Sequence, residues 1–115
     1  MNSVPRIDES LCRSAQPVFE FVGRRWVAAV LLAGSSGARR FSEYRTATGI
    51  SDRLLTQRLR ELEQHGMIDR IVVPTMPVQI SYEPTARGVE LVRAMQPLIR
   101  WGRSLDADAA AGLNA

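Results

Sequence analysis

The sequence predicts a small α+β domain that is mainly helical, with five helices and one two-stranded hairpin. Apolar residues recur at helical spacing along most of the chain, and the period changes to two only once, over residues 68–82. A length of 115 residues, 45% of them hydrophobic, suits one globular domain and leaves no room for a second core. We expect this domain to span residues 10–105, with flexible ends at residues 1–9 and 106–115.

The first two helices are predicted on either side of Gly23. Residues 10–22 carry apolar side chains at helical spacing, but Pro17 interrupts them. The segment therefore either kinks there or starts afresh with the proline in its first turn. Residues 24–33 are nearly all apolar, which predicts a buried helix, and residues 34–37 form a flexible loop.

Two further helices with a tight turn between them follow. Ser42 is expected to cap a short helix over residues 43–48, since its hydroxyl can accept a hydrogen bond from a first-turn amide. Gly49 ends that helix. A longer helix is expected over residues 51–65, opened by its serine and closed by Gly66.

The only hairpin is predicted where β-branched residues alternate with polar ones. Residues 68–73 form the first strand, residues 74–77 a stiff turn with two prolines, and residues 78–83 the return strand. The last helix is expected over residues 86–105, where Pro97 can introduce a kink.

The helix at residues 51–65 has two different sides. One is a stripe of leucines for the core, formed by Leu54, Leu55, Leu59 and Leu62. The other carries the residue types that read base edges, because arginine pairs with guanine, glutamine pairs with adenine and threonine contacts thymine. Considered without its neighbours, a polar helix side of this composition is more often an ordinary solvent-exposed surface. A helix, a glycine turn, a second helix and a hairpin, however, make a winged helix-turn-helix, which binds DNA. We therefore expect four residues to enter the major groove: Arg53, Thr56, Gln57 and Arg60.

Other polar residues flank this motif. Arg39 and Arg40 precede its first helix, where they either contact phosphates or serve as solubilising loop charges. Ser51 is first a cap, although helix N-termini also attract phosphate. Arg58 lies on the flank between core and groove and is expected to pair with Glu61, three residues on.

Charge and composition narrow the function further. The net charge is +3, the isoelectric point is near 10.0, and all 15 basic residues are arginine, whose planar guanidinium suits phosphates and guanine. Cys12 and His65 are single residues of their kind, so we expect no internal disulfide, metal or cofactor. No catalytic pair or phosphate-binding glycine loop occurs, which predicts a non-enzyme. The polar residues 1–10 do not resemble a signal peptide and residues 26–33 are too short to cross a membrane, so a cytoplasmic protein is expected.

Several segments resemble the HxlR-type winged helix regulators. They are Gly23-Arg24-Arg25-Trp26, residues 40–43 and 50–63, Gly66-Met67-Ile68, and the residues Tyr82, Thr85 and Gly88. The resemblance covers about residues 12–102. It implies a MarR-like, dimeric regulator of transcription that binds double-stranded DNA at a pseudo-palindromic operator. Many members respond to small molecules or to oxidative and electrophilic stress.

The sequence departs from this family at two functional positions. The wing turn at residues 74–78 has no basic residue, and Gln79 stands where members commonly carry arginine, so a weak wing contact is expected. Members often carry a cysteine about where Arg13 lies, and here Cys12 is one residue earlier. Cys12 is therefore either a redox sensor or a small apolar side chain.

The terminal helices are expected to form the dimer interface. The last helix carries two apolar stripes, and the domain needs only one of them. Dimerisation also has a physical reason, since one recognition helix reads few base pairs and two-fold symmetry doubles the contact. The expected interface residues are Leu11, Val18, Phe19, Leu91, Met95, Leu98 and Trp101.

The favoured hypothesis is a sequence-specific transcriptional regulator, more often a repressor, which a small molecule or an oxidant releases from DNA. A winged helix that binds another protein and no specific DNA is the alternative, and the uncharged wing turn favours it. A ligand or redox sensor with a secondary DNA role is the third hypothesis.

Overall fold

The computed structural model describes residue 6 and residues 8–110, with side chains up to residue 106. The elements within these residues are, in order, α1 (Glu9–Val22), α2 (Val27–Ser35), α3 (Phe41–Thr48), α4 (Asp52–Gln64), β1 (Ile68–Val73), β2 (Gln79–Pro84) and α5 (Ala86–Ala110). This arrangement confirms the mainly helical α+β class with one two-stranded sheet. The expected flexible ends fall largely on residues 1–5, 7 and 111–115, which lie outside the described residues.

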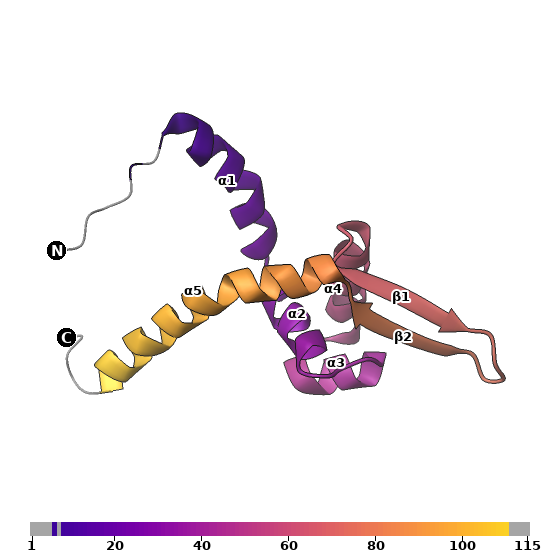
Figure 1. The fold of residues 1–115 in the computed structure, drawn as a ribbon. Helices are drawn as coiled ribbons and strands as arrows, with labels where there is room; N and C mark the ends of the chain where they lie inside the picture. Colours follow the sequence, from indigo (N-terminus) through magenta and orange to yellow (C-terminus); the bar gives the residue numbers. More distant parts are fainter. Residues whose placement is uncertain (1–5, 7, 111–115) are drawn as a thin grey trace.

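The body of the molecule consists of α2, α3, α4 and the hairpin, and two helical arms leave it (Figure 1). α5 crosses the body and extends well beyond it, while the hairpin points the opposite way. α1 diverges from α5, and none of its residues is buried. The long, thin shape, 62 × 38 × 22 Å, follows from these arms.

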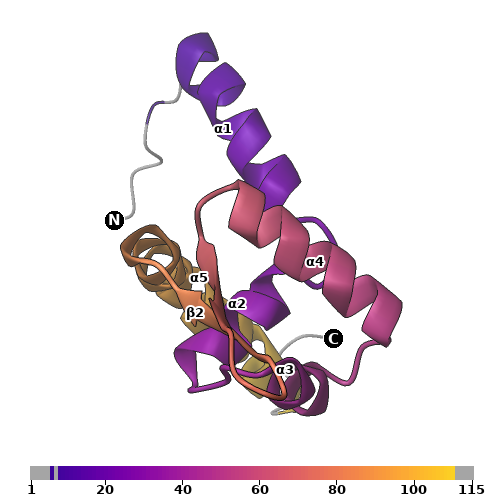
Figure 2. The same ribbon diagram turned by 90° about the vertical axis from the view of Figure 1, so that its right-hand side faces the viewer.

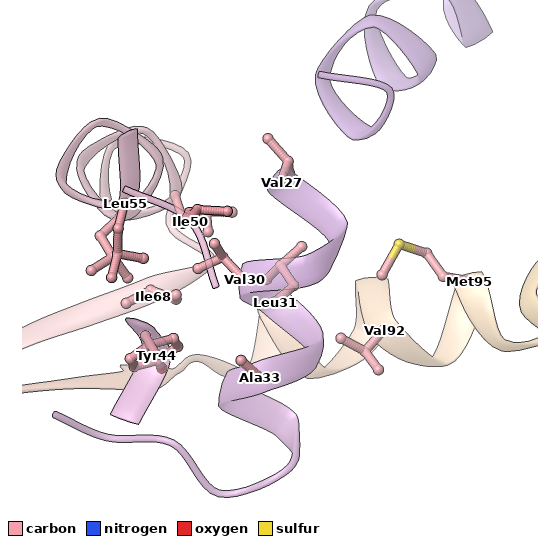
Figure 3. Packing of buried hydrophobic residues seen from close by; sticks show 12 residues of the cluster. Val27, Val30, Leu31, Ala33, Tyr44, Ile50, Leu55, Ile68, Val92 and Met95 are labelled. Carbon is pink, nitrogen blue, oxygen red and sulfur yellow. The ribbon is translucent and has the colours of Figure 1, made fainter. Parts of the chain in front are cut away.

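The core surrounds α2, which contacts the other four helices and β2 (Figure 3). Val27, Val30 and Leu31 are almost wholly buried because this helix is apolar on all sides. Burying each such side chain stabilises the fold by about 1.5–3 kcal/mol. The other core residues are Ala33, Tyr44, Ile50, Leu55, Leu59, Leu62, Ile68, Val92 and Met95.

Three helix limits differ from the prediction. α1 starts at Glu9, since the Asp8 carboxylate accepts a hydrogen bond from the Leu11 amide at 2.9 Å, and it runs through Pro17 as one helix. α2 starts at Val27, three residues later than expected. α5 continues through its proline to Ala110, five residues beyond the expected end.

The late start of α2 is explained by Trp26. Its φ of 75° is left-handed, a conformation that a bulky residue adopts only where its surroundings impose it. The Val27 amide donates to the Arg24 carbonyl at 3.1 Å, so residues 24–27 form a separate turn. This turn is the corner that joins the α1 arm to the body.

The start of α3 also differs from the prediction. Ser42 lies within the first turn, and Arg40 takes the capping position. The Glu43 carboxylate accepts hydrogen bonds from the Arg40 amide at 2.8 Å and the Arg39 amide at 3.0 Å. These two bonds hold the pKa of the Glu43 carboxyl below its ordinary value. Glu43, at the third position of the helix, therefore caps the start of α3 in place of Ser42.

The segment that joins the hairpin to α5 is tightly held. The Thr85 hydroxyl donates to the Gly66 carbonyl at 2.6 Å and accepts from the Gly88 amide at 3.1 Å. The Thr85 amide donates to the Met67 carbonyl at 3.0 Å. Gly88 is buried against that same carbonyl, so close that a β-carbon would collide with it. These contacts fix the direction in which α5 leaves the body.

Candidate nucleic-acid interface

α4 is seated by its leucines and leaves a polar side free. Leu55, Leu59 and Leu62 are buried at the spacing of one helical face. Ser51 caps the helix, since its hydroxyl oxygen accepts from the Leu54 amide at 3.2 Å. Ser51 therefore has the structural role that the sequence predicted for it. Figure 2 shows α4 along one side of the body with the hairpin beside it.

The residues predicted to read bases lie together on the exposed side of α4. Arg53, Thr56, Gln57 and Arg60 follow one another at intervals of three, one and three residues, and all four are exposed. The Thr56 hydroxyl donates to the Asp52 carbonyl at 2.8 Å, so its methyl group and oxygen lone pairs remain for a base. In the described part of the chain, the two arginines and Gln57 form no side-chain hydrogen bond or ion pair. Their donors are free for DNA.

The turn between α3 and α4 has a defined geometry. Gly49 adopts a φ of 74°, which glycine tolerates without strain, and the next residue, Ile50, is buried. Arg45 of α3 forms an ion pair with Asp52 of α4 at 3.2 Å. This turn fixes the angle between the two helices of the motif.

The hairpin stands next to the polar side of α4. Its strands pair in antiparallel register from Ile68 opposite Pro84 to Val73 opposite Gln79. Residues 71–82 carry no charge, and Met76 at the tip is 99% exposed. The uncharged wing turn predicted from the sequence is therefore also fully accessible.

A groove of about 370 Å³ separates α4 from the wing, lined by Thr56, Leu59, Arg60, Glu63, Arg70 and Tyr82. Arg70 is a candidate DNA contact that the sequence analysis missed. The alternation of the strand places Arg70 on the same sheet face as Ile68, which is buried beneath α4. This alternation of side chains along the strand could have identified Arg70 from the sequence. The wing thus has a cation at its base, although it has none at its tip.

Arg39 and Arg40 differ in their surroundings. The Arg39 Nη1 donates to the carbonyls of Gly34 at 2.8 Å and Ala38 at 2.7 Å, which ties this guanidinium to the loop. The Arg39 carbonyl also accepts from the Tyr82 amide at 2.7 Å. Arg40 is exposed, and in the described residues its guanidinium has no partner. Of the two, Arg40 is the freer to meet a phosphate.

Tyr44 joins α3 to the wing. It is fully buried, and its hydroxyl donates to the Tyr82 carbonyl at 2.8 Å. Burial raises the pKa of Tyr44 to about 12, so the phenol stays neutral and keeps its proton for this bond. The wing is thereby attached to the helix-turn-helix through a side chain as well as through the sheet backbone.

A cluster of two arginines and one glutamate ties α4 to the corner between α1 and α2. Glu61 accepts from Arg58 of α4 and from Arg24 of the corner, both at 3.0 Å. Arg58 Nε donates to the Arg25 carbonyl at 2.7 Å. The predicted Arg58–Glu61 pair is therefore confirmed. Because only 13% of the Arg58 side chain is exposed, it is occupied in this cluster and not in the groove.

Removal of the Glu61 charge is expected to destabilise the protein. Glu61→Gln weakens both charge-assisted hydrogen bonds and leaves the largely buried Arg58 side chain without a counter-charge, at a cost of about 1–3 kcal/mol. Urea unfolding followed by circular dichroism measures this cost. Glu63→Gln removes an equal charge from an exposed position of the same helix and serves as the control. Equal midpoints for the two variants would show that the cluster contributes nothing.

The predicted dimer residues of α1 are exposed in the single chain. Phe19 is 67% exposed, and Leu11 and Val18 about half. On α5, Leu98 is 55% and Trp101 61% exposed, whereas Leu91 is partly buried. Met95 differs from the others because it packs in the core of its own chain, at 6% exposure. Val18 and Phe19 face Leu91 and Leu98 across a hollow of about 200 Å³ between the arms.

Cys12 lies on the exposed surface of α1. It shares an open apolar hollow with Leu11, Ala15 and Phe19. The described residues contain no cluster of three metal-ligating side chains. None of the described helices has the length and apolarity needed to cross a membrane.

Comparison with known proteins agrees with this geometry. The HTH-type transcriptional regulator YvaP of Bacillus subtilis is 34% identical over 92 residues, which is 79% of this chain and 85% of that protein. A structure of diamide-treated YodB from B. subtilis superposes with a TM-score of 0.69 at 28% identity, over 87% of this chain and 96% of that one. A MarR-family regulator of Enterococcus faecalis V583 gives a TM-score of 0.76 at 26% identity, over 96% and 99% of the two chains.

A profile described as HxlR-like helix-turn-helix matches residues 21–109, from the end of α1 to nearly the end of α5. The match includes the turn, α4, the wing and the Thr85–Gly88 junction. The relatives are transcriptional regulators and not enzymes. The chain therefore belongs to the HxlR-like helix-turn-helix family and is a DNA-binding transcriptional regulator.

Proposed function

We propose that the protein is a homodimeric repressor that binds a pseudo-palindromic operator through α4. The observation that carries this proposal is the exposed, unpaired side of α4, held in place by its buried leucines and set beside the wing. Arg53, Thr56, Gln57 and Arg60 would read base edges in the major groove. Arg70 lies in the groove beside this surface, and Arg40 precedes α3, the first helix of the motif; both would contact phosphates.

The dimer in this proposal is formed by the two arms. Phe19, Leu98 and Trp101 expose large apolar surfaces in a single chain, and such surfaces on a soluble domain mark an interface. A two-fold axis between the arms would present two copies of α4 to successive major grooves. Since its DNA partner lies there, we place the protein in the cytoplasm.

Replacement of Arg60 tests the major-groove role. Arg60→Ala is expected to weaken operator binding by about 1–3 kcal/mol, or roughly 5- to 150-fold, if the guanidinium pairs with a guanine. Fluorescence anisotropy at several salt concentrations measures the loss. Arg103→Ala on α5 removes the same charge away from α4 and serves as control. An equal loss of affinity in both variants would show that Arg60 contributes only through the overall positive charge of the protein and not through a base contact.

A fragment of the gene's own upstream region is a suitable first operator. Specific retardation of that fragment in a gel shift, against a scrambled fragment of equal length, is the expected result. If the dimer retards neither fragment, the alternative of a protein-interaction module, which the uncharged wing favours, takes precedence.

A redox response through Cys12 is a second candidate function, and the exposure of this thiol on α1 favours it. The related YodB is known in reduced, diamide-treated and quinone-bound structures. The chain has one cysteine, so a disulfide here needs a second subunit or a small thiol. In that step diamide takes two electrons and two protons from the two thiols, and an S–S bond forms between them.

Diamide is therefore expected to release the wild-type protein from operator DNA and to leave Cys12→Ser bound. Binding is measured before and after treatment, and again after reduction with dithiothreitol, which should restore it. An equal loss in the wild type and in Cys12→Ser would exclude the thiol as the switch, and so would no loss in either.

A further inference from the structure

The outer half of the wing, residues 71–80, is apolar and largely exposed. Val72 is 45% exposed, Val78 is 56% exposed, and Met76 at the tip is 99% exposed. None of these ten residues carries a charge. A continuous exposed apolar surface on a globular domain marks a contact with a partner.

This surface is continuous with the groove beside α4. Arg70 and Tyr82 pair across the hairpin and line that groove opposite the polar side of α4. Val72 and Ile80 form the next pair on the same face of the sheet, because side chains alternate between the two faces. The face of the wing that borders α4 therefore begins with a cation and continues outward with apolar side chains.

The wing is long enough to reach a second groove of DNA. Its strands have six residues each and span roughly 20 Å. The hairpin leaves the body in the direction opposite to α5 in Figure 1, and in Figure 2 it lies beside α4. The major groove is about 12 Å wide. With α4 in that groove, the hairpin would cross the sugar-phosphate backbone and place its tip at the neighbouring minor groove.

The tip of the wing is held in one shape. The Thr75 amide donates to the Val73 carbonyl at 2.8 Å, and the Thr75 hydroxyl donates to the Pro77 carbonyl at 2.8 Å. The rings of Pro74 and Pro77 restrict the backbone on either side of the threonine. A tip restrained in this way loses little conformational entropy when it binds.

We propose that the wing tip is an apolar wedge, in which Met76 inserts between two base pairs from the minor groove and bends the DNA. Side chains that unstack and kink a duplex in this way are apolar, and methionine is one of them. A wing that reads the minor groove by electrostatic attraction needs a cation, and residues 71–82 have none. The proposal rests on the proposed function, since α4 must hold the DNA while the tip inserts.

The wedge adds a second determinant of sequence specificity. Steps such as TA and CA unstack easily, whereas A-tracts are stiff and have a narrow minor groove that attracts cations. The preferred DNA is therefore expected to carry a flexible step under the wing, outside the bases that α4 contacts.

Bending is measured with the full chain on circularly permuted fragments of the gene's own upstream region. Met76→Ser is expected to reduce the bend by about 20° or more, the smallest kink typical of an inserted side chain. Met76→Leu keeps an apolar wedge and should bend the DNA like the wild type. Val89→Ser removes an exposed apolar side chain from α5 and serves as the control. Because Met76 is almost wholly exposed, its variants are expected to fold normally.

Two synthetic duplexes test the wedge without a known operator. Both have about 30 A·T pairs, one with alternating T and A and the other with all adenines on one strand. The wild type is expected to bind the alternating duplex at least about threefold more tightly, because its TA steps unstack more easily. Met76→Ser should lose this preference, and Met76→Arg should reverse it.

The salt dependence of binding separates the wedge from a phosphate contact. Met76→Ser should weaken binding to the alternating duplex without a change in the slope of log affinity against log salt, since an apolar contact releases no counterions. Arg70→Gln should reduce that slope by about 0.9.

Several results would overturn the wedge. They are an equal bend in the wild type and Met76→Ser, an equal loss of bending in Met76→Ser and Met76→Leu, and a changed salt slope in Met76→Ser. Equal binding of both duplexes by the wild type would overturn it as well, and the apolar wing would then be left for a protein partner. If the upstream fragment is bound no better than a scrambled one, the proposed operator is wrong, and the synthetic duplexes still decide whether the tip inserts.

Discussion

Gly88→Ala is expected to destabilise the fold by roughly 2–3 kcal/mol, which at this size lowers the melting temperature by about 10 °C. A β-carbon at position 88 would collide with the Met67 carbonyl, a backbone group that has no flexible end to move aside. That carbonyl also accepts the Thr85 amide, so a shift of α5 would strain this bond as well. The collision outweighs the gain of about 0.5–1 kcal/mol that alanine normally brings to a helix interior.

Gly102→Ala is the matched control for this prediction. It lies on the same helix, and a β-carbon there meets no atom within 4 Å. The control is expected to be neutral or slightly stabilising. Thermal and urea unfolding at one protein concentration compare the two. Equal stability of both variants would mean that α5 can leave the hairpin at another angle.

Leu98→Glu is expected to abolish the proposed dimer, with a loss of at least about 100-fold in association. Leu98 is 55% exposed in the single chain and lines the hollow between α1 and α5, where the partner's arms would cover it. A carboxylate buried there has no partner, and the cost of several kcal/mol exceeds what the apolar contact contributes. Operator affinity should fall with it, since a monomer contacts only one half-site.

Sedimentation velocity over a range of concentrations tests this prediction. Val89→Glu introduces the same charge at an exposed valine on the opposite flank of α5, and should remain dimeric. A Leu98→Glu protein that sediments as an intact dimer would place the interface on another surface. A monomeric Val89→Glu would show that any added charge on this helix disrupts assembly.

Much of this fold could be predicted because its signals are local. The leucine spacing of α4 predicted its buried side, and the left-handed Gly49 and Gly66 lie where the sequence predicted helix ends. The polar side of α4 followed from the same periodicity. The four polar residues on this side could be grouped from the period of a helix alone, without knowledge of contacts between distant segments.

The helix limits were predicted less well, because side chains compete for the same backbone groups. Glu43 replaces Ser42 at the start of α3 by accepting two amides that lie outside the helix. The left-handed Trp26 delays α2, and no local pattern predicts that conformation in a bulky residue. The starts of α2 and α3 both depend on how the neighbouring segments pack against one another.

The sequence by itself determined the class of the fold, the family and the division of α4 into a buried and an exposed polar side, because these follow from spacing along the chain. Only the tertiary structure decided the contacts between residues far apart in the chain. The Arg24 side chain donates a hydrogen bond to Glu61, 37 residues further along the chain. The Arg39 carbonyl accepts one from the amide of Tyr82, 43 residues further along. Met95 is turned into the core and Arg93 into an open hollow, although both lie on the same helix. The angle between α5 and the body decides which apolar stripe of α5 packs in the core. Close contact between Gly88 and the Met67 carbonyl sets this angle, and the contact forms only when the chain has folded.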